Sequence, residues 1–246
     1  MEFTLEICVD SVESAVAARE AGAGRLELCC ALSDGGLTPG WGLLKSVLSN
    51  VDIPVNVLIR PRGSDFLYTD NEFEIMKKDI EMCGESGAAG VVFGILNADS
   101  SVDTERTTML VNFASPMTVT FHRTFDLCPD PFRALEDIIS TGACRLLTSG
   151  QKPLAAEGAK LLKKLLLQSK GRIIIMPRGG LSDKNIAEIA RLTGASEFHL
   201  SAGRTEESGM VYGNIEMLKI ISGSSYPLKR ADRNMIISII EKLKMV

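Results

Sequence analysis

The sequence lacks the features that would place it in a membrane or on a nucleic acid. None of its apolar runs approaches the roughly 20 residues of a membrane-spanning helix. The formal net charge is −4 and the basic runs are short, so a surface of clustered Lys and Arg for nucleic acid is not expected. An expected strand at residues 3–8 leaves no room for a signal peptide. These absences predict a cytoplasmic protein with neither a membrane nor a nucleic-acid partner.

Paired cysteine motifs are also missing. None of the six cysteines belongs to a Cys-X-X-Cys pair, which argues against a zinc ribbon or a thioredoxin-type motif. In a reducing cytoplasm disulfides are not expected either. Histidine is scarce, with two residues in the whole chain, so the position of each is informative.

What the chain does have is a regular alternation of strand-like and helix-like segments. The expected strands are 3–8, 25–30, 54–60, 90–95, 117–122, 144–148, 172–176 and 197–201. The expected helices are 11–22, 39–50, 70–86, 103–113, 130–141, 155–169, 182–193 and 230–243. Eight of each without a low-complexity linker predict an α/β protein, a single (β/α)₈ TIM barrel over residues 1–246.

Two details qualify this fold. Residues 202–226 are poorly periodic, and we expect an irregular segment there, an extended loop or a short helix, before the last helix. An open doubly wound sheet is the rival architecture. It would carry a Gly-X-Gly-X-X-Gly turn after the first strand, where Cys8-Val9-Asp10-Ser11 stands instead.

A near-identical tetrapeptide occurs on each of the first two strands, as Leu5-Glu6-Ile7-Cys8 and Leu26-Glu27-Leu28-Cys29. The alternation of a strand puts Glu and Cys on one face of it. The helix expected between the two strands makes them parallel. As neighbours in register, the two carboxylates and the two thiols would lie side by side, about 4.8 Å apart.

Ionisable and polar residues gather at the carboxyl ends of the expected strands, the end at which TIM barrels hold their active sites. In chain order these residues are Glu6, Cys8, Glu27, Cys29, Cys30, Arg60, Arg62, His122, Arg123, Ser149, His199 and Ser201. Both histidines of the chain fall in this set, which predicts a functional site at the mouth of the barrel.

Structural roles are the alternative for several of these residues. A carboxylate inside a barrel needs a positive or hydrogen-bonding partner, so Glu27 could pair with Arg60 and Glu6 with Arg123. His122 could be a hydrogen-bonded core residue, and Cys30 a small buried apolar residue.

Eight motifs together resemble the CutC copper homeostasis family. They are Glu6-Ile7-Cys8-Val9-Asp10-Ser11, Leu26-Glu27-Leu28-Cys29, Gly35-Gly36-Leu37-Thr38-Pro39, Ile59-Arg60-Pro61-Arg62, Asp65-Phe66-Leu67-Tyr68, Phe121-His122-Arg123, Leu147-Thr148-Ser149-Gly150 and Phe198-His199. The resemblance implies a cytoplasmic (β/α)₈ barrel, often a homo-oligomer, that handles copper. It also implies a Cu(I) site whose ligands are the cysteines of the first two strands, Cys8 and Cys29 here. Cu(I) is soft and prefers thiolate, which agrees with that ligand pair, and Cys30 would be an accessory ligand.

The chain departs from the family pattern at four positions. Arg178 stands in the loop Met176-Pro177-Arg178-Gly179-Gly180, where the family usually has glycine. If that position needs a positive φ, Arg178 strains the loop; otherwise it occupies the anion site that barrels often build there. Gly24, Ser64 and Gly203 are the other departures.

Three functions follow as hypotheses. The first is a copper homeostasis protein that binds Cu(I) through Cys8 and Cys29. The second is an enzyme on a small anionic, phosphorylated or unphosphorylated, substrate, and whether the chain is an enzyme stays open. In it Glu27 or His122 would be the acid or base and Arg60 would orient the anion. Its substrate-binding set would be Glu6, Arg62, Arg123, Ser149, His199 and Ser201. The third is a scaffold with a vestigial mouth.

Overall fold

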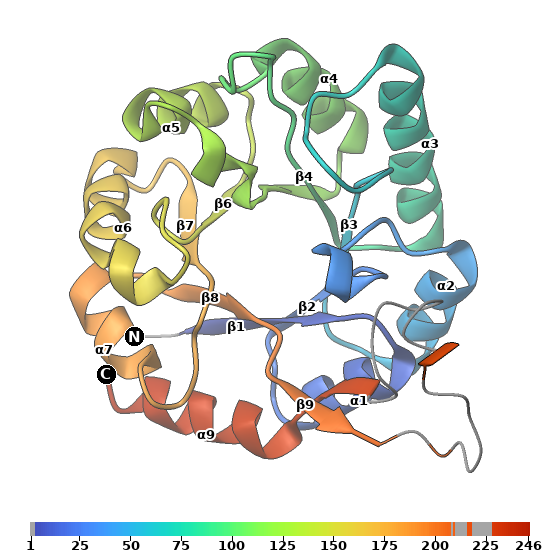
Figure 1. Cartoon of the computed structure of the whole chain (residues 1–246), viewed down its shortest axis with the longest axis vertical. Helices are drawn as coiled ribbons and strands as arrows, with labels where there is room; N and C mark the ends of the chain where they lie inside the picture. Colours follow the sequence, from blue (N-terminus) through green and yellow to red (C-terminus); the bar gives the residue numbers. More distant parts are fainter. Residues whose placement is uncertain (1–2, 208, 210–215, 218–227) are drawn as a thin grey trace.

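The computed structural model describes residues 3–207, 209, 216–217 and 228–246. Eight parallel strands form a barrel, and helices surround it in a ring (Figure 1). The barrel strands are β1 (Thr4–Val9), β2 (Arg25–Leu28), β3 (Val55–Leu58), β4 (Gly90–Phe93), β5 (Thr118–Phe121), β6 (Arg145–Thr148), β7 (Ile174–Pro177) and β8 (Glu197–Leu200). The α-helices among the described residues are α1 (Val12–Glu20), α2 (Trp41–Asn50), α3 (Asp70–Ser86), α4 (Thr104–Ala114), α5 (Pro131–Ser140), α6 (Ala155–Ser169), α7 (Ile186–Thr193) and α9 (Arg233–Lys244).

The strand order closes the expected barrel almost completely. Hydrogen-bonded neighbours run β7-β6-β5-β4-β3-β2-β1-β8, so successive strands lie side by side and β1 also pairs with β8. Between β7 and β8 a single parallel bridge, Arg178 to His199, joins the two edges of the sheet. The TIM-barrel fold predicted from the sequence is therefore confirmed.

Local signals in the sequence account for the helix boundaries. The Thr69 hydroxyl accepts a hydrogen bond from the Glu72 amide while the Glu72 carboxylate accepts one from Thr69, a capping box that starts α3. The Asp130 carboxylate is the N-cap of α5, as Thr69 is of α3, and Pro131 lies in the first turn of α5. Gly87 ends α3 in the left-handed conformation that glycine adopts without strain.

Two apolar clusters fill the molecule. The larger one packs the outward faces of the strands against the helices and includes Ile7, Leu26 and Phe121. The smaller one consists of Cys8, Cys29, Leu58 and Val92. The two thiols therefore pack against Leu58 and Val92, apart from the main core.

The segment expected to be irregular is only partly described. Its residues Gly203–Glu206 form β9, which pairs antiparallel with β10 (Leu228–Ala231) immediately before α9. Residues 208, 210–215 and 218–226 lie outside the described residues. Among the described helices, none combines the length and hydropathy needed to cross a membrane.

Candidate functional site

The first two strands are parallel neighbours, but their register differs from the simplest expectation. Glu6 lies opposite Arg25, and Cys8 lies opposite Glu27. The expectation that like residues pair across the ladder is therefore wrong, because strands in a closed barrel are staggered along one another. The stagger places a thiol beside a carboxylate.

The two thiols nevertheless meet. Cys29 follows the end of β2, and its amide donates to the Val9 carbonyl, which holds this residue against the end of β1. The Sγ atoms of Cys8 and Cys29 lie 3.7 Å apart, and both cysteines are reduced and buried. Cys30, predicted as an accessory ligand, donates its thiol hydrogen bond to the Thr38 carbonyl instead. The pair is thus formed by Cys8 and Cys29 alone.

A carboxylate and an imidazole stand beside this pair. One donor atom each from Cys8, Glu27 and His199 lie within 4.8 Å of one another, and all three residues are buried. The Cys8 thiol donates to Glu27 Oε1 at 3.5 Å. Hydrogen bonding to Cys29, burial and the charge of Glu27 raise the pKa of the Cys8 thiol well above its ordinary value. In the metal-free protein Cys8 is therefore a protonated thiol at neutral pH.

The ionisable partners of this group have shifted pKa values. Burial raises the pKa of Glu27, and no described residue forms a hydrogen bond with its Oε2. Burial alone would lower the pKa of His199. The charge of Glu27 and hydrogen bonds with Cys8 and Glu6 outweigh it and raise that pKa to about 10. His199 is thus an imidazolium at pH 7, positioned by its 2.8 Å contact from Nδ1 to Glu6 Oε1.

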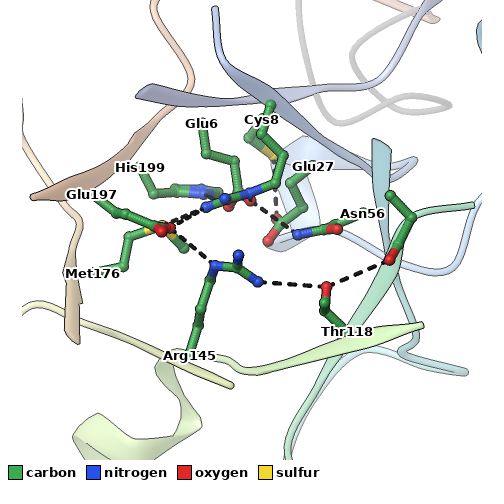
Figure 2. Close-up of polar contacts among 11 residues, drawn as sticks. Glu6, Cys8, Glu27, Asn56, Thr118, Arg145, Met176, Glu197 and His199 are labelled. Atoms are coloured by element: carbon green, nitrogen blue, oxygen red, sulfur yellow. Dashed lines mark hydrogen bonds and ion pairs between the residues drawn. The ribbon is translucent and has the colours of Figure 1, made fainter. Parts of the chain in front are cut away.

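Glu6 belongs to a network of charges deeper in the barrel (Figure 2). Its carboxylate binds Arg25 and accepts a hydrogen bond from the Asn56 amide at 3.2 Å. Arg25 continues to Glu197 at 2.6 Å, and Arg145 reaches the same Glu197 oxygen at 2.9 Å. The predicted pair of Glu6 with Arg123 is wrong.

The sequence did not predict this network, because its residues lie away from the carboxyl ends of the strands, where TIM barrels hold their active sites. Arg25, Arg145 and Glu197 are the first residues of β2, β6 and β8. The available signal was a charged residue at the first position of a short strand, since an inward-facing charge there needs a partner of opposite sign.

Three predicted binding residues hold loops and do not line the mouth. The Arg60 guanidinium donates to the backbone carbonyls of Asp34, Gly36 and Ser64 at 2.9–3.1 Å. The predicted pair of Glu27 with Arg60 is wrong, since Glu27 contacts Cys8.

The other two residues are engaged in a similar way. Arg62 forms ion pairs with Asp65 and Glu72. The Ser149 hydroxyl bonds to the Asp126 carboxylate and to the Lys152 carbonyl.

The remaining predicted residues surround one cavity of about 440 Å³ at the mouth. Its lining includes Cys8, Glu27, Cys29, His122, Arg123, Arg178, His199 and Ser201. Burial, followed by the charge of Arg60, lowers the pKa of His122 to about 3, so this imidazole is neutral. The mouth thus combines two soft thiols, two histidines in different charge states, the carboxylates of Glu27 and Asp10, and the basic groups of Arg123, Arg178, Lys229 and Arg230.

Arg178 does not strain the loop that follows β7. The positive φ angles fall on the next residues, Gly179 at 92° and Gly180 at 68°. The Arg178 amide donates to the Thr148 carbonyl, and the residue takes part in the bridge to His199. Its side chain lines the cavity instead.

Comparison with known proteins places these features in a family. The sequence model described as the CutC family matches residues 3–204. The copper homeostasis protein cutC homolog of Homo sapiens is 50% identical over 232 residues, which cover 94% of this chain and 85% of that protein. A family protein CutC of Chromobacterium violaceum is 48% identical over 212 residues, 86% of either chain.

Solved structures agree with the sequence comparison. A CutC protein of Streptococcus agalactiae superposes with a TM-score of 0.77 at 32% identity, over 81% of this chain and 98% of that one. A phosphoribosylanthranilate isomerase of Thermotoga maritima, at 12% identity and a TM-score of 0.61, covers 99% of this chain and all of that one. The second likeness shows the barrel fold alone.

Proposed function

This chain belongs to the CutC family, and we propose that it serves copper homeostasis by binding Cu(I) between Cys8 and Cys29. The observation that carries the proposal is the 3.7 Å separation of the two sulfur atoms at the mouth cavity. Thiolates are the ligands that select Cu(I) over harder ions, and two of them suffice. Their apolar neighbours Leu58 and Val92 offer no competing donor.

The distance between the sulfurs bears on the coordination. Two Cu–S bonds in a line span about 4–5 Å, slightly more than the present separation. A two-coordinate ion would therefore widen the pair by a small rotation of Cys8. A bent pair would instead admit a third donor, and His199 is the softest one nearby once its imidazolium has lost a proton. Glu27 is a hard donor and a poor ligand for Cu(I).

Binding must release protons, because only the thiolate is a ligand. The Cys8 thiol already donates to Glu27, a carboxylate with one oxygen that lacks a described partner. We propose that Glu27 accepts the Cys8 proton as copper binds and passes it to the solvent in the mouth cavity, which Glu27 lines. The imidazolium of His199 then offsets the negative charge that the thiolates bring into the cavity.

The test is a Cu(I) titration against a chromophoric Cu(I) chelator under anaerobic, reducing conditions. We expect roughly one tightly bound Cu(I) per chain, lost in the Cys8→Ala/Cys29→Ala variant because a single copper needs both thiolates. Cys144→Ala is the matched control, since it removes an exposed thiol far from the pair in the chain. A double variant that binds Cu(I) as tightly as the parent protein contradicts the proposal.

The second candidate function is that of an enzyme. Two buried polar atoms without a hydrogen-bond partner among the described residues favour it. They are Glu27 Oε2 and His122 Nε2, and both side chains line the same cavity. A carboxylate with a raised pKa is suited to proton transfer with a bound substrate. A metabolite screen by thermal shift tests this candidate. A ligand whose stabilisation disappears in Glu27→Gln supports it, and a screen without any stabilising ligand removes it.

Location and assembly are further parts of the proposal. The family resemblance implies a cytoplasmic homo-oligomer, and light scattering coupled to size exclusion tests the assembly. A mass equal to that of one chain, 26.6 kDa, would contradict it.

A further inference from the structure

Arg178 has a guanidinium group that the fold leaves without partners. Its Nε and Nη1 atoms are buried, and no described residue accepts a hydrogen bond from either. A buried donor without an acceptor costs on the order of 1–3 kcal/mol, and more when it is charged. By contrast, two arginines that follow β3 do have partners. Arg60 donates hydrogen bonds to backbone carbonyls, and Arg62 donates to the Glu72 carboxylate.

The carboxylates around Arg178 do not supply the missing acceptor. Both Asp126 oxygens are occupied, by Thr148 and Gln151 on one side and Ser149 on the other. Among the described residues, Glu27 comes within 4 Å of no Arg or Lys nitrogen. Arg178 therefore sits among acceptors that are used or out of reach.

A second positive charge faces the same space. Burial and the neighbouring charge of Arg123 lower the pKa of Arg178, and Arg123 also lines the cavity. Two like charges at one cavity repel unless an anion lies between them. The Nε2 atom of the neutral His122 is a third buried atom without a described partner at this wall.

We propose that Arg178, with Arg123 and His122, forms a subsite for an oxyanion, the carboxylate or phosphate group of a small molecule held in the mouth cavity. A guanidinium suits this role because its planar fork matches two oxygens of such a group. The volume of about 440 Å³ is in the range of small-molecule pockets.

The same cavity also indicates a second polar group that the bound ligand would carry. Glu27 Oε2 is an acceptor without a described partner on the cavity wall. A ligand with a hydroxyl group near its anionic group would satisfy both ends, so hydroxy acids and phosphorylated polyols are the favoured class. The subsite stands beside the thiol pair and is independent of copper.

The test is calorimetric titration of the copper-free protein at low ionic strength with inorganic phosphate, glycerol 3-phosphate, malate and, as neutral control, glycerol. We expect at least one of the three anions to bind, and glycerol not to bind. Whether glycerol 3-phosphate or malate binds more tightly tells a phosphate ligand from a carboxylate one. In Arg178→Ala the affinity should fall about tenfold to a hundredfold, the usual loss for a hydrogen bond to a charged group.

Controls separate this subsite from a general charge effect and from copper. Arg133→Ala removes the same charge from an exposed side chain and should leave anion binding unchanged. Arg178→Lys keeps the positive charge but lacks the planar guanidinium, so its affinity for the anion should fall several-fold. This variant also tests the subsite if Arg178→Ala fails to fold. Cys8→Ala/Cys29→Ala should retain anion binding while losing Cu(I). Binding of no anion, or equal losses in Arg178→Ala and Arg133→Ala, would overturn the proposal.

Discussion

At the scale of single residues, the thiol of Cys8 is the most unusual group in the site. It is buried, donates to a carboxylate and has a raised pKa. Reactive cysteines have lowered pKa values. Cys8 is instead a protonated thiol, which becomes a ligand only when a metal displaces its proton.

This state makes copper affinity depend on pH. Each proton that copper displaces to solvent should make the apparent Cu(I) affinity rise about tenfold for each pH unit, and the protonated Cys8 supplies one such proton. Competition titrations at pH 6, 7 and 8 measure the slope. An affinity that does not change with pH would mean that Cys8 is ionised before copper binds, or is not a ligand.

The residues of the site were predictable to different degrees. Cys8 and Cys29 stand out because polar residues on the inward face of a barrel strand need a reason. Residue type did not separate Arg60 and Arg62 from Arg178 as anion binders, since the folding of the loops decides which guanidinium is occupied. Arg60 donates to the Gly36 carbonyl and Arg62 to the nearby Leu67 carbonyl. Loop conformation is a tertiary property that short motifs do not encode.

At the scale of elements, an internal charge network ties four strands together. Arg25 of β2 binds Glu6 of β1 and Glu197 of β8, and Arg145 of β6 joins at Glu197. All four side chains are largely shielded from solvent. Removing one charge leaves the others buried without compensation.

Arg25→Met should therefore destabilise the protein by about 3–5 kcal/mol, the usual cost of breaking a buried ion pair from one side. Urea unfolding measures it. Arg172→Met is the matched control, because the pair of Arg172 with Glu136 is exposed and solvent screens it, so its loss should cost clearly less than the loss of Arg25. Equal costs in the two variants would show that the network does not hold the strands.

Substituting alanine for a glycine in each of two helices should change the stability of the protein in opposite directions. A Cβ on Gly158 of α6 would stand 1.9 Å from the Ser149 carbonyl, whereas one on Gly42 of α2 would meet nothing within 4 Å. Gly158→Ala should cost about 1–3 kcal/mol by overpacking. Gly42→Ala should stabilise the protein by about 1 kcal/mol because alanine favours the helix. Thermal unfolding of both variants checks the opposite signs.

Element positions followed closely from sequence, while register did not. The expected strand at 25–30 contains β2, Arg25–Leu28, and the expected helix at 70–86 is α3. Periodicity and caps are local, so they locate elements. The stagger that sets Cys8 against Glu27 depends on closure of the whole barrel.

At the scale of the whole molecule, the buried pair of Glu6 and His199 should shape stability against pH. The hydrogen bonds and charges of His199 and Arg25 overcome burial and lower the pKa of Glu6 to about 2, from 4.5. Its contribution is present above pH 4.5 and is lost as the pH falls toward 2. The pKa of His199 is raised from 6.5 to about 10, so its contribution is present below pH 6.5 and is lost toward pH 10.

Denaturant unfolding across pH 2–10 tests this pair. We expect the contribution of the pair to be greatest between pH 4.5 and 6.5. Glu6→Gln should flatten the acid limb of the curve, since glutamine does not titrate. An acid limb of unchanged slope in that variant would show that other carboxylates govern it.

The proposed function rests on Cu(I) bound between two thiolates at the barrel mouth. X-ray absorption at the copper K edge of the protein loaded with one equivalent of Cu(I) tests it most directly. We expect two sulfur neighbours for the copper, and the loss of both in Cys8→Ala/Cys29→Ala. A spectrum with only nitrogen and oxygen neighbours, or one that the double substitution leaves unchanged, would contradict it.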